Sequence, residues 1–379
     1  MSNDASGGRH LGFGTRCLHV GQGPDPATGA AAPPIHQTTS YEFPDAEVAA
    51  ARYAAGDNVV SASSIYGGTH TYLAHTASRR GIEARFVDTL DARAYAEAID
   101  EDTAYVHCET VGNPSLVTPP LERIADVAHD HGVPLVVDNT FATPALCRPL
   151  DHGADVVWES TTKWIHGSGT TIGGVLVSDG SFPFEAYPEK YPEVGGPNPA
   201  FDGVNFTERF GDRAIVTAAR QRGARSLGDP QSPFDAWVTL QGVETLQVRM
   251  ERHCENAAAV AEFLADHPEV AWVTYPGLES HETHELASRY LDGGYGGMIA
   301  FGPAGGYDAA MRVCEDTEVA TFLANVGDAR TLLIHPASTT HAQLTDAEQR
   351  ASGVTPELVR LSVGIEDVDD VIADLDGVL

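Results

Sequence analysis

The sequence has few basic residues and almost no lysine. Its 379 residues include 23 lysines and arginines against 54 aspartates and glutamates, so the formal net charge is −31. Only Lys163 and Lys190 are lysines. A long nucleic-acid footprint requires clustered cations, and the composition argues against one. High acidity with scarce lysine is typical of halophilic proteins, in which concentrated salt screens self-repulsion; an ordinary acidic cytosolic protein is the alternative.

Cysteine pairs and long apolar runs are also absent from the sequence. The five cysteines lie far apart and form no C-x-x-C pair, which predicts reduced thiols and no metal site. No window approaches 18 consecutive apolar residues, and the N-terminal residues contain no apolar signal core. We therefore expect a soluble cytoplasmic protein, and the 42% hydrophobic content is enough for a globular core.

From residue 58 onward, short β-branched runs alternate with longer helical stretches. The segments NVVSAS, EARFVD, AYVHCE, PLVVDN and DVVWES predict strands, and PPLERIADVAHDHG predicts a helix opened by proline and closed by Gly132. This alternation indicates an α/β fold with a mostly parallel sheet. Such sheets bind ligands at the carboxyl ends of their strands, where Asp138 and the run from Ser160 to Lys163 lie.

The second half of the chain predicts a long loop, a long helix and a smaller α/β domain. Residues 183–233 are rich in Gly, Pro, Phe and Tyr, which favours a loop with short helices. Residues 233–264 have helical periodicity, interrupted at most by Gly242. Short strands, helices and an acidic helical tail follow. We predict three parts, at residues 1–55, 56–250 and 251–379.

Lys163 and Asp138 are the residues whose positions indicate chemistry. Lys163 lies in a Ser/Thr-rich turn after a strand, where a desolvated lysine can form an imine with an aldehyde. Asp138 ends an apolar strand and needs a cationic partner. Their separation is one strand-helix-strand step, so both should emerge at the same sheet edge. A pyridoxal phosphate (PLP) enzyme needs this pair, although a surface lysine and a helix-capping or arginine-paired aspartate remain open.

Several long and specific stretches carry a resemblance to a known family. They are FGTRCLHVGQGPDPATGAAAPPIHQTTSYEF, GDNVVSASSIYGGT, ETVGNPSL through VDNTFATP, ESTTKWIHGSGTTIGG, QGVETLQVRMERHCENA, ANVGDARTLLIHPASTTHAQL and RLSVGIED. Together they resemble the Cys/Met-metabolism family of PLP enzymes, and most closely its O-acetylhomoserine sulfhydrylases, over nearly the whole chain. The resemblance implies an aspartate-aminotransferase-like (fold-type I) architecture, in which residues 1–55 form an N-terminal arm and residues 56–250 bind the cofactor.

The resemblance assigns roles around the cofactor. Lys163 corresponds to the lysine that binds the PLP aldehyde and later moves a proton, and Asp138 to the partner of the pyridine nitrogen. Ser160 and Thr162 correspond to phosphate ligands. Tyr66 resembles the tyrosine that stacks on the cofactor ring and assists proton transfer, with a core aromatic at a helix start as the alternative.

Three further residues have roles implied by the resemblance. Asn113 resembles the residue near the phenolic oxygen of the ring, although a turn asparagine would fit the same pattern. Arg360 resembles the clamp for the substrate carboxylate, which suits a planar guanidinium, and Ser338 is expected to assist it. A structural salt bridge is the alternative for Arg360 in so acidic a chain.

The implied reaction is a γ-replacement on O-acetylhomoserine. Sulfide or a small thiol replaces acetate, which gives homocysteine or methionine. Cystathionine γ-synthase and methionine γ-lyase chemistry occur on the same scaffold and remain open, since a fold alone does not choose among them. The resemblance also implies a homo-oligomer, with a homotetramer as our expectation, whose active sites lie between subunits.

The chain departs from the family pattern after Tyr53. About fifty residues that relatives carry before AGDNVV are missing, including a Tyr-x-Arg pair and a Ser-Gly-(Gln/Met)-Ala-Ala loop that grip the cofactor phosphate. We expect lower cofactor affinity, and either exposed apolar surface or altered packing where a helix would cover the sheet. A natural deletion, an error in the gene prediction and compensation by a partner subunit all remain open. A catalytically impaired pseudoenzyme is therefore the alternative to a working transferase.

Overall fold

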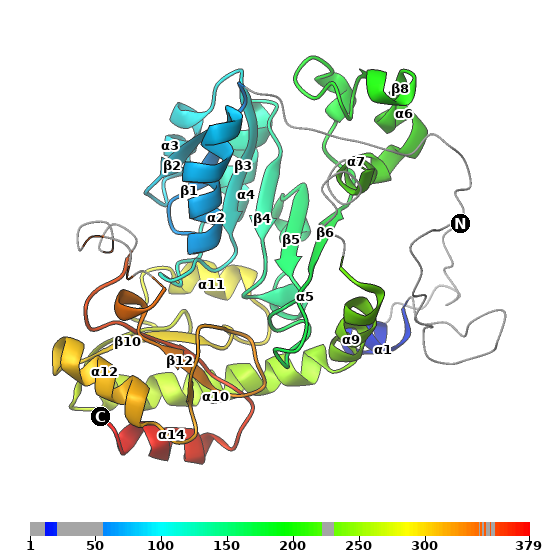
Figure 1. The fold of residues 1–379 in the computed structure, drawn as a ribbon. Coiled ribbons are helices and arrows are strands. Elements are labelled where there is room, and N and C mark those ends of the chain that lie inside the picture. The colour runs from blue at the N-terminus through cyan, green and yellow to red at the C-terminus, as the bar shows by residue number, and fades with distance from the viewer. Residues whose placement is uncertain are drawn as a thin grey trace.

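The computed structural model describes a six-stranded sheet in the first large domain (Figure 1). It describes residues 12–20, 56–221, 231–340 and 353–379, together with residues 342, 345 and 349. The strand order is β2-β1-β3-β4-β5-β6, and only β6 runs antiparallel to its neighbour. The predicted α/β fold with a mostly parallel sheet is confirmed. The strands are β1 (Asn58–Ala62), β2 (Glu83–Val87), β3 (Thr103–Glu109), β4 (Leu135–Asp138), β5 (Val156–Ser160) and β6 (Gly174–Ser178).

Short helices connect these strands and cover part of the sheet. In α4 the residues Leu121, Ile124, Ala125 and Ala128 are buried, which is the spacing of one helix face. The helix begins after two prolines, and Gly132 follows its end with a φ of +64° that favours glycine. The connecting helices are α2 (Gly67–Thr71) with its π and 3₁₀ extensions (Tyr72–Ala77 and Ser78–Arg80), α3 (Ala92–Ala98), α4 (Leu121–Asp130), α5 (Thr143–Leu146) and a 3₁₀ turn (Pro149–His152).

The edge strand β6 carries exposed apolar side chains. Val175, Leu176 and Val177 are exposed by 40%, 39% and 43%, and Trp158 on the neighbouring strand is also exposed. Edge strands usually carry charges or prolines that discourage further pairing, and β6 carries neither. The apolar surface expected from the missing segment stays a prediction, because residues 21–55 lie outside the described residues.

Residues 181–221 form a small aromatic subdomain beyond β6. Phe182, Phe184, Phe201 and Phe206 are buried together with Val194. The prediction of a loop with short helices is confirmed for its described part, while residues 222–230 lie outside the described residues. Its elements are the 3₁₀ turns Phe184–Ala186, Pro199–Phe201 and Gly211–Arg213, the strands β7 (Pro197–Asn198) and β8 (Val204–Asn205), and the helices α6 (Phe206–Phe210) and α7 (Ala214–Ala219).

Two consecutive helices, α9 (Pro233–Glu244) and α10 (Leu246–Asp266), follow this subdomain. The break between them lies at Thr245, so the predicted interruption at Gly242 is wrong. Gly242 has another role, because a Cβ there would lie 2.4 Å from the backbone oxygen of His166. The described part of the predicted arm is α1 (Phe13–His19), which packs against these two helices (Figure 1); most of residues 1–55, including the position of the missing segment, lies outside the described residues.

The C-terminal domain is built on a second sheet of five strands, ordered β11-β12-β13-β10-β9. The predicted domain limit at 250/251 falls inside α10, whose Met250 packs in the first core while Val260 packs in the second. The limits therefore stay a prediction. The elements are β9 (Val270–Thr274), α11 (His284–Tyr290), β10 (Met298–Pro303), α12 (Gly306–Asp316), β11 (Thr321–Phe322), β12 (Leu332–Ile334), a 3₁₀ turn (Pro336–Ser338), β13 (Val359–Ser362) and α14 (Val368–Asp376).

The described ranges lack two features that would indicate other functions. No helix there is both long enough and apolar enough to span a bilayer. Within the same ranges, no three His, Cys, Asp or Glu side chains are grouped so that they could hold a metal ion. The five cysteines are all buried as thiols.

Candidate active site

The candidate site lies at the carboxyl ends of β3, β4 and β5. Thr140 connects two of these ends. Its backbone N–H donates to Oδ1 of Asp138 at 2.9 Å, and its hydroxyl oxygen accepts the backbone N–H of Ser160 at 2.9 Å. The strand topology thus brings Asp138 and the lysine turn to the same edge of the sheet, as the sequence spacing predicts.

Lys163 follows β5 in a turn packed against the C-terminal domain. Its Nζ donates to Oδ1 of Asn325, which lies 162 residues further along the chain. Gly327, two residues later, has a φ of +75°, and a Cβ there would lie 2.6 Å from the backbone nitrogen of Trp164. Burial lowers the pKa of Lys163, and the positive charge of Arg360 adds to that effect. A lowered pKa increases the neutral amine fraction, which is the form that attacks a carbonyl.

A buried arginine anchors the turn that carries Lys163. The guanidinium of Arg249 donates to the carbonyl oxygens of Trp164 (2.6 Å), Ile165 (3.0 Å) and Gly242 (2.7 Å). Its Nε donates to the hydroxyl of Thr245 at 3.0 Å. Burial lowers the pKa of Arg249 to about 10, and within the described residues no carboxylate pairs with it. The arginine therefore connects the lysine turn to both long helices.

Three carboxyl groups lie at the ends of β3, β4 and β5, with Glu109 and Asp138 on one face of the sheet and Glu159 on the other. Glu109 and Asp138 are register partners on neighbouring strands, so their side chains leave the same face. Burial raises the pKa of both, and the proximity of Asp138 raises the pKa of Glu109 further. Burial also raises the pKa of Glu159 to about 8, against a hydrogen bond from Asn139 that lowers it.

No lysine, arginine or histidine in the described ranges forms an ion pair with Glu109, Asp138 or Glu159. Burying several carboxyls without a cation is unfavourable, and a cationic group beside them would relieve that cost. The protonated ring nitrogen of PLP is such a group. Glu109, Asp138 and Lys163 therefore fit PLP.

Tyr66, Asn113 and Arg360 converge beside this edge. Oδ1 of Asn113 accepts a hydrogen bond from Arg360 at 3.1 Å, and Tyr66 lies close enough to act on the charge of Arg360. Tyr66 is 55% exposed, so its ring is accessible from solvent. Burial lowers the pKa of Arg360 to about 10, which leaves it charged at neutral pH. Within the described residues Arg360 pairs with no carboxylate, so its fork can receive one.

The hydroxyl groups predicted to bind phosphate differ in their surroundings. Oγ1 of Thr162 donates to the carbonyl of Gly173 at 3.3 Å and accepts the N–H of Gly173 at 3.1 Å. Ser160 is half-buried at the end of β5. Thr162 thus already supports the turn, and Ser160 has the less constrained hydroxyl.

Ser338 lies on the C-terminal side of the site. Its hydroxyl is 2.8 Å from Nδ1 of His335 and 3.4 Å from Sδ of Met311. Its segment follows Ile334, which is the register partner of Arg360 on the neighbouring strand. The described contacts tie the Ser338 side chain to His335 and do not join it to Arg360.

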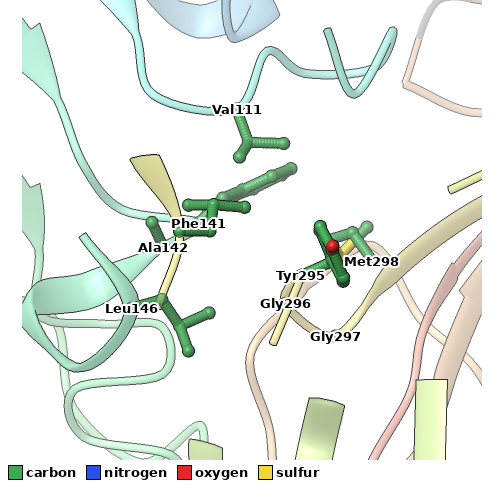
Figure 2. Close-up of a pocket in the computed structure, with 9 residues that line it drawn as sticks. Val111, Phe141, Ala142, Leu146, Tyr295, Gly296, Gly297 and Met298 are labelled. Carbon is green, nitrogen blue, oxygen red and sulfur yellow. The ribbon is translucent and has the colours of Figure 1, made fainter. Parts of the chain in front are cut away.

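Figure 2 shows a small pocket lined mostly by apolar side chains. Val111, Phe141, Leu146, Tyr295 and Met298 are among the residues that line it. None of the predicted site residues contributes to its wall. Phe141 packs edge-on against Trp164 with a centroid distance of 5.3 Å, so one wall of the pocket contacts the residue that follows Lys163.

Four contributors to the site escaped the sequence analysis: Asn325, Glu109, Thr140 and Arg249. Asn325 lies in the stretch ANVGDARTLL, which resembles the family, but its partner is 162 residues away. Glu109 and Thr140 follow the same strand-end rule that identifies Asp138, so that rule applied to every strand would have found them.

The site combines a desolvated lysine, buried acids that need a cation and an arginine that can receive a carboxylate. Together these groups define an enzyme that acts on amino acids through PLP. The chain belongs to the Cys/Met metabolism PLP-dependent enzyme family, whose pattern matches residues 46–379. It is 45% identical over 414 positions to the homocysteine synthase of Schizosaccharomyces pombe, covering 96% of each chain. It is 41% identical to O-acetyl-L-homoserine sulfhydrylase 1 of Thermus thermophilus, covering 96% of this chain and 98% of the relative.

A solved structure gives the same fold. It is assigned as an O-acetylhomoserine (thiol)-lyase from Campylobacter jejuni and contains pyridoxyl-lysine monophosphate. The TM-score is 0.89 at 32% identity, covering 97% of this chain and 99% of that one. The fold-type I architecture expected from the sequence is confirmed.

The length of one alignment indicates that a segment is missing from this chain. The alignment with the S. pombe relative has 414 positions, whereas 96% of 379 residues is about 364. About 50 positions of that relative therefore have no counterpart in this chain, in agreement with the deletion expected from the sequence.

Proposed function

We propose that this protein catalyses a PLP-dependent γ-replacement on O-acetylhomoserine. Sulfide or a small thiol replaces the acetate group, which gives homocysteine or methionine. The observation that carries the proposal is the buried acidic set around Asp138 beside the desolvated Lys163, with Arg360 free to receive a carboxylate. The names of the S. pombe and T. thermophilus relatives support this choice of substrate.

The residues around the sheet edge would hold the cofactor. Asp138 would pair with the ring nitrogen, and Lys163 would bind the aldehyde carbon. Asn113 would lie near the phenolic oxygen, and the exposed Tyr66 side chain would stack on the ring. Ser160 and Thr162 would contact the phosphate. PLP supplies an electron sink for charge that develops on the substrate carbons.

Proton movement would depend on Lys163. Its lowered pKa increases the fraction of neutral amine, which is the form that can accept a proton from the α-carbon. The amide oxygen of Asn325 accepts a hydrogen bond from Nζ and so limits where the amine can point. Tyr66 would assist the transfer to the γ-leaving group. The bond from the γ-carbon to acetate breaks, and a bond from the same carbon to the sulfur of the thiol forms.

Substrate orientation would depend on Arg360. Its guanidinium would bind the substrate carboxylate through two parallel hydrogen bonds. Its hydrogen bond to Oδ1 of Asn113 would hold the guanidinium in position. Ser338 would assist from the neighbouring segment of the C-terminal domain.

We propose a cytoplasmic homotetramer adapted to high salt. The net charge of −31 with only two lysines supports the salt adaptation. The loss of about 50 positions supports a contribution from a neighbouring subunit, because Ser160 and Thr162 alone are a sparse set of phosphate ligands for a dianion.

A product assay tests the proposed reaction. Purified protein at molar salt is incubated with PLP, O-acetylhomoserine and sulfide, and homocysteine is measured against a Lys163→Ala control. We expect homocysteine and acetate in equal amounts from the wild type only. Product from O-succinylhomoserine and cysteine instead would indicate cystathionine γ-synthesis, and ammonia from methionine alone would indicate γ-lysis. No product above the control would leave an impaired pseudoenzyme, which the missing positions favour.

A further inference from the structure

We propose that Glu109 is a positioning residue for the cofactor face of the site. Its carboxylate holds together the two loops that carry Tyr66 and Asn113, beside the end of the strand that carries Asp138. The inference rests on the proposed function, since it assumes that these loops contact PLP.

The geometry uses both oxygens of the Glu109 carboxylate. Oε1 accepts the backbone N–H of Tyr66 at 2.6 Å, and Oε2 accepts the backbone N–H of Asn113 at 3.0 Å. Glu109 is only 5% exposed and is the last residue of β3. Tyr66 follows β1, which pairs with β3, so one side chain joins the ends of two neighbouring strand-loop connections.

These two contacts favour a carboxylate: the N–H groups of Tyr66 and Asn113 lower the pKa of Glu109, against burial and the charge of Asp138, which raise it. Two N–H donors that point at two different oxygens are both satisfied by an anion, whereas a glutamine offers one acceptor and presents an NH₂ group to the second donor. A charged acceptor also forms a stronger hydrogen bond than a neutral one. Both oxygens are occupied within the protein, so Glu109 acts on the reaction through the residues it holds.

The contacts continue from Glu109 to the proposed substrate clamp. The N–H of Asn113 donates to Glu109, and Oδ1 of the same asparagine accepts from Arg360. A shift of the Asn113 backbone therefore moves the partner of Arg360 as well as the group expected near the phenolic oxygen. The backbone of Tyr66 lies at the N-cap position of α2 and donates to Glu109. The direction of its ring therefore depends on the same anchor.

The test compares cofactor binding in matched variants. Wild type, Glu109→Gln and Asp155→Asn are prepared without cofactor, and PLP is titrated while the visible band of bound cofactor and the intrinsic fluorescence are followed. Asp155 is the control, because its buried carboxylate also accepts a backbone N–H, from Leu135 at 2.7 Å, and a histidine at 2.8 Å. Its bond to Leu135 joins the opposite end of the sheet, at the start of β4.

We expect the Kd for PLP to rise at least about tenfold in Glu109→Gln, which corresponds to the loss of one charge-assisted hydrogen bond. The Asp155→Asn value should stay within about twofold of wild type. The band position should shift only in Glu109→Gln, and its KM for the amino-acid substrate should rise along with the Kd. If Glu109→Gln does not fold, Glu109→Asp keeps the charge but is too short to reach both donors, and it should show the same loss.

Two results would overturn the role of Glu109: folded Glu109→Gln that binds PLP as tightly as wild type, or Asp155→Asn that loses as much affinity. Wild-type protein that shows no band at saturating PLP would overturn the proposed function instead, and the two failures are therefore distinguishable.

Discussion

Arg249 offers the sharpest test of how the lysine turn is held. Arg249→Met keeps most of the side-chain length but removes every donor to Trp164, Ile165, Gly242 and Thr245. Methionine is a strong helix former, so α10 itself should not be weakened. The predicted damage is confined to the carbonyls that the guanidinium satisfies.

The magnitude follows from opposing contributions. Each buried carbonyl left without a donor costs about 1–3 kcal/mol, and the turn carbonyls of Trp164 and Ile165 lose their guanidinium donor. Removing the buried guanidinium offsets part of this loss, because keeping its charge away from water is itself unfavourable. We therefore expect a net loss of about 3 kcal/mol in the free energy of unfolding, within the range seen when a buried charged network is broken.

Urea unfolding at molar salt, followed by far-ultraviolet circular dichroism and tryptophan fluorescence, measures this loss. Arg252→Met is the matched control, because Arg252 lies on the same helix, is half exposed and pairs with Glu255 only at 3.5 Å. That control should change stability by no more than about 0.5 kcal/mol. A loss below about 1 kcal/mol in Arg249→Met would refute the reasoning that the arginine anchors the lysine turn.

Three further predictions concern other parts of the molecule. Arg360→Ala should raise the KM for the amino-acid substrate about 100-fold, since two charge-assisted hydrogen bonds are lost; an unchanged KM in steady-state kinetics would contradict the clamp. Because burial raises the pKa of Glu159 from 4.5 to about 8, the folded protein keeps a proton that the unfolded chain has lost, and stability should fall as pH rises through that window. Glu159→Gln should remove roughly 2–4 kcal/mol of this fall between pH 5 and pH 9 in urea titrations, and identical pH profiles would count against it. Leu176→Thr on the exposed edge strand should reduce binding of a hydrophobic fluorescent dye while stability changes by about 0.5 kcal/mol or less; unchanged dye binding would locate the apolar surface elsewhere.

Local sequence patterns predicted most of the first sheet. The strands around Val59, Val106 and Val137 are short β-branched runs separated by turn residues, and their period is visible without any tertiary information. The end of α9 was harder to predict from the sequence. Gly242 suggested a break, but it is glycine because the backbone of His166 approaches it, and the break lies at Thr245. Close approach between distant segments leaves no local signal.

The candidate site divides in the same way. Lys163 and Asp138 could be paired from the chain because parallel strand topology brings successive strand ends together. Asn325 could not be paired with Lys163, since nothing local links residues 162 positions apart. Arg249 has the appearance of an ordinary helix-surface charge, and only the tertiary packing shows that its guanidinium is buried among carbonyls.

The most direct test of the central claim is the absorbance of the wild-type protein from 300 to 500 nm at molar salt. The spectrum is recorded before PLP, after PLP and after O-acetylhomoserine, with Lys163→Ala alongside. The account predicts a visible band that requires Lys163 and changes when the substrate is added. A folded wild-type protein without that band, or with a band that O-acetylhomoserine leaves unchanged, would contradict it.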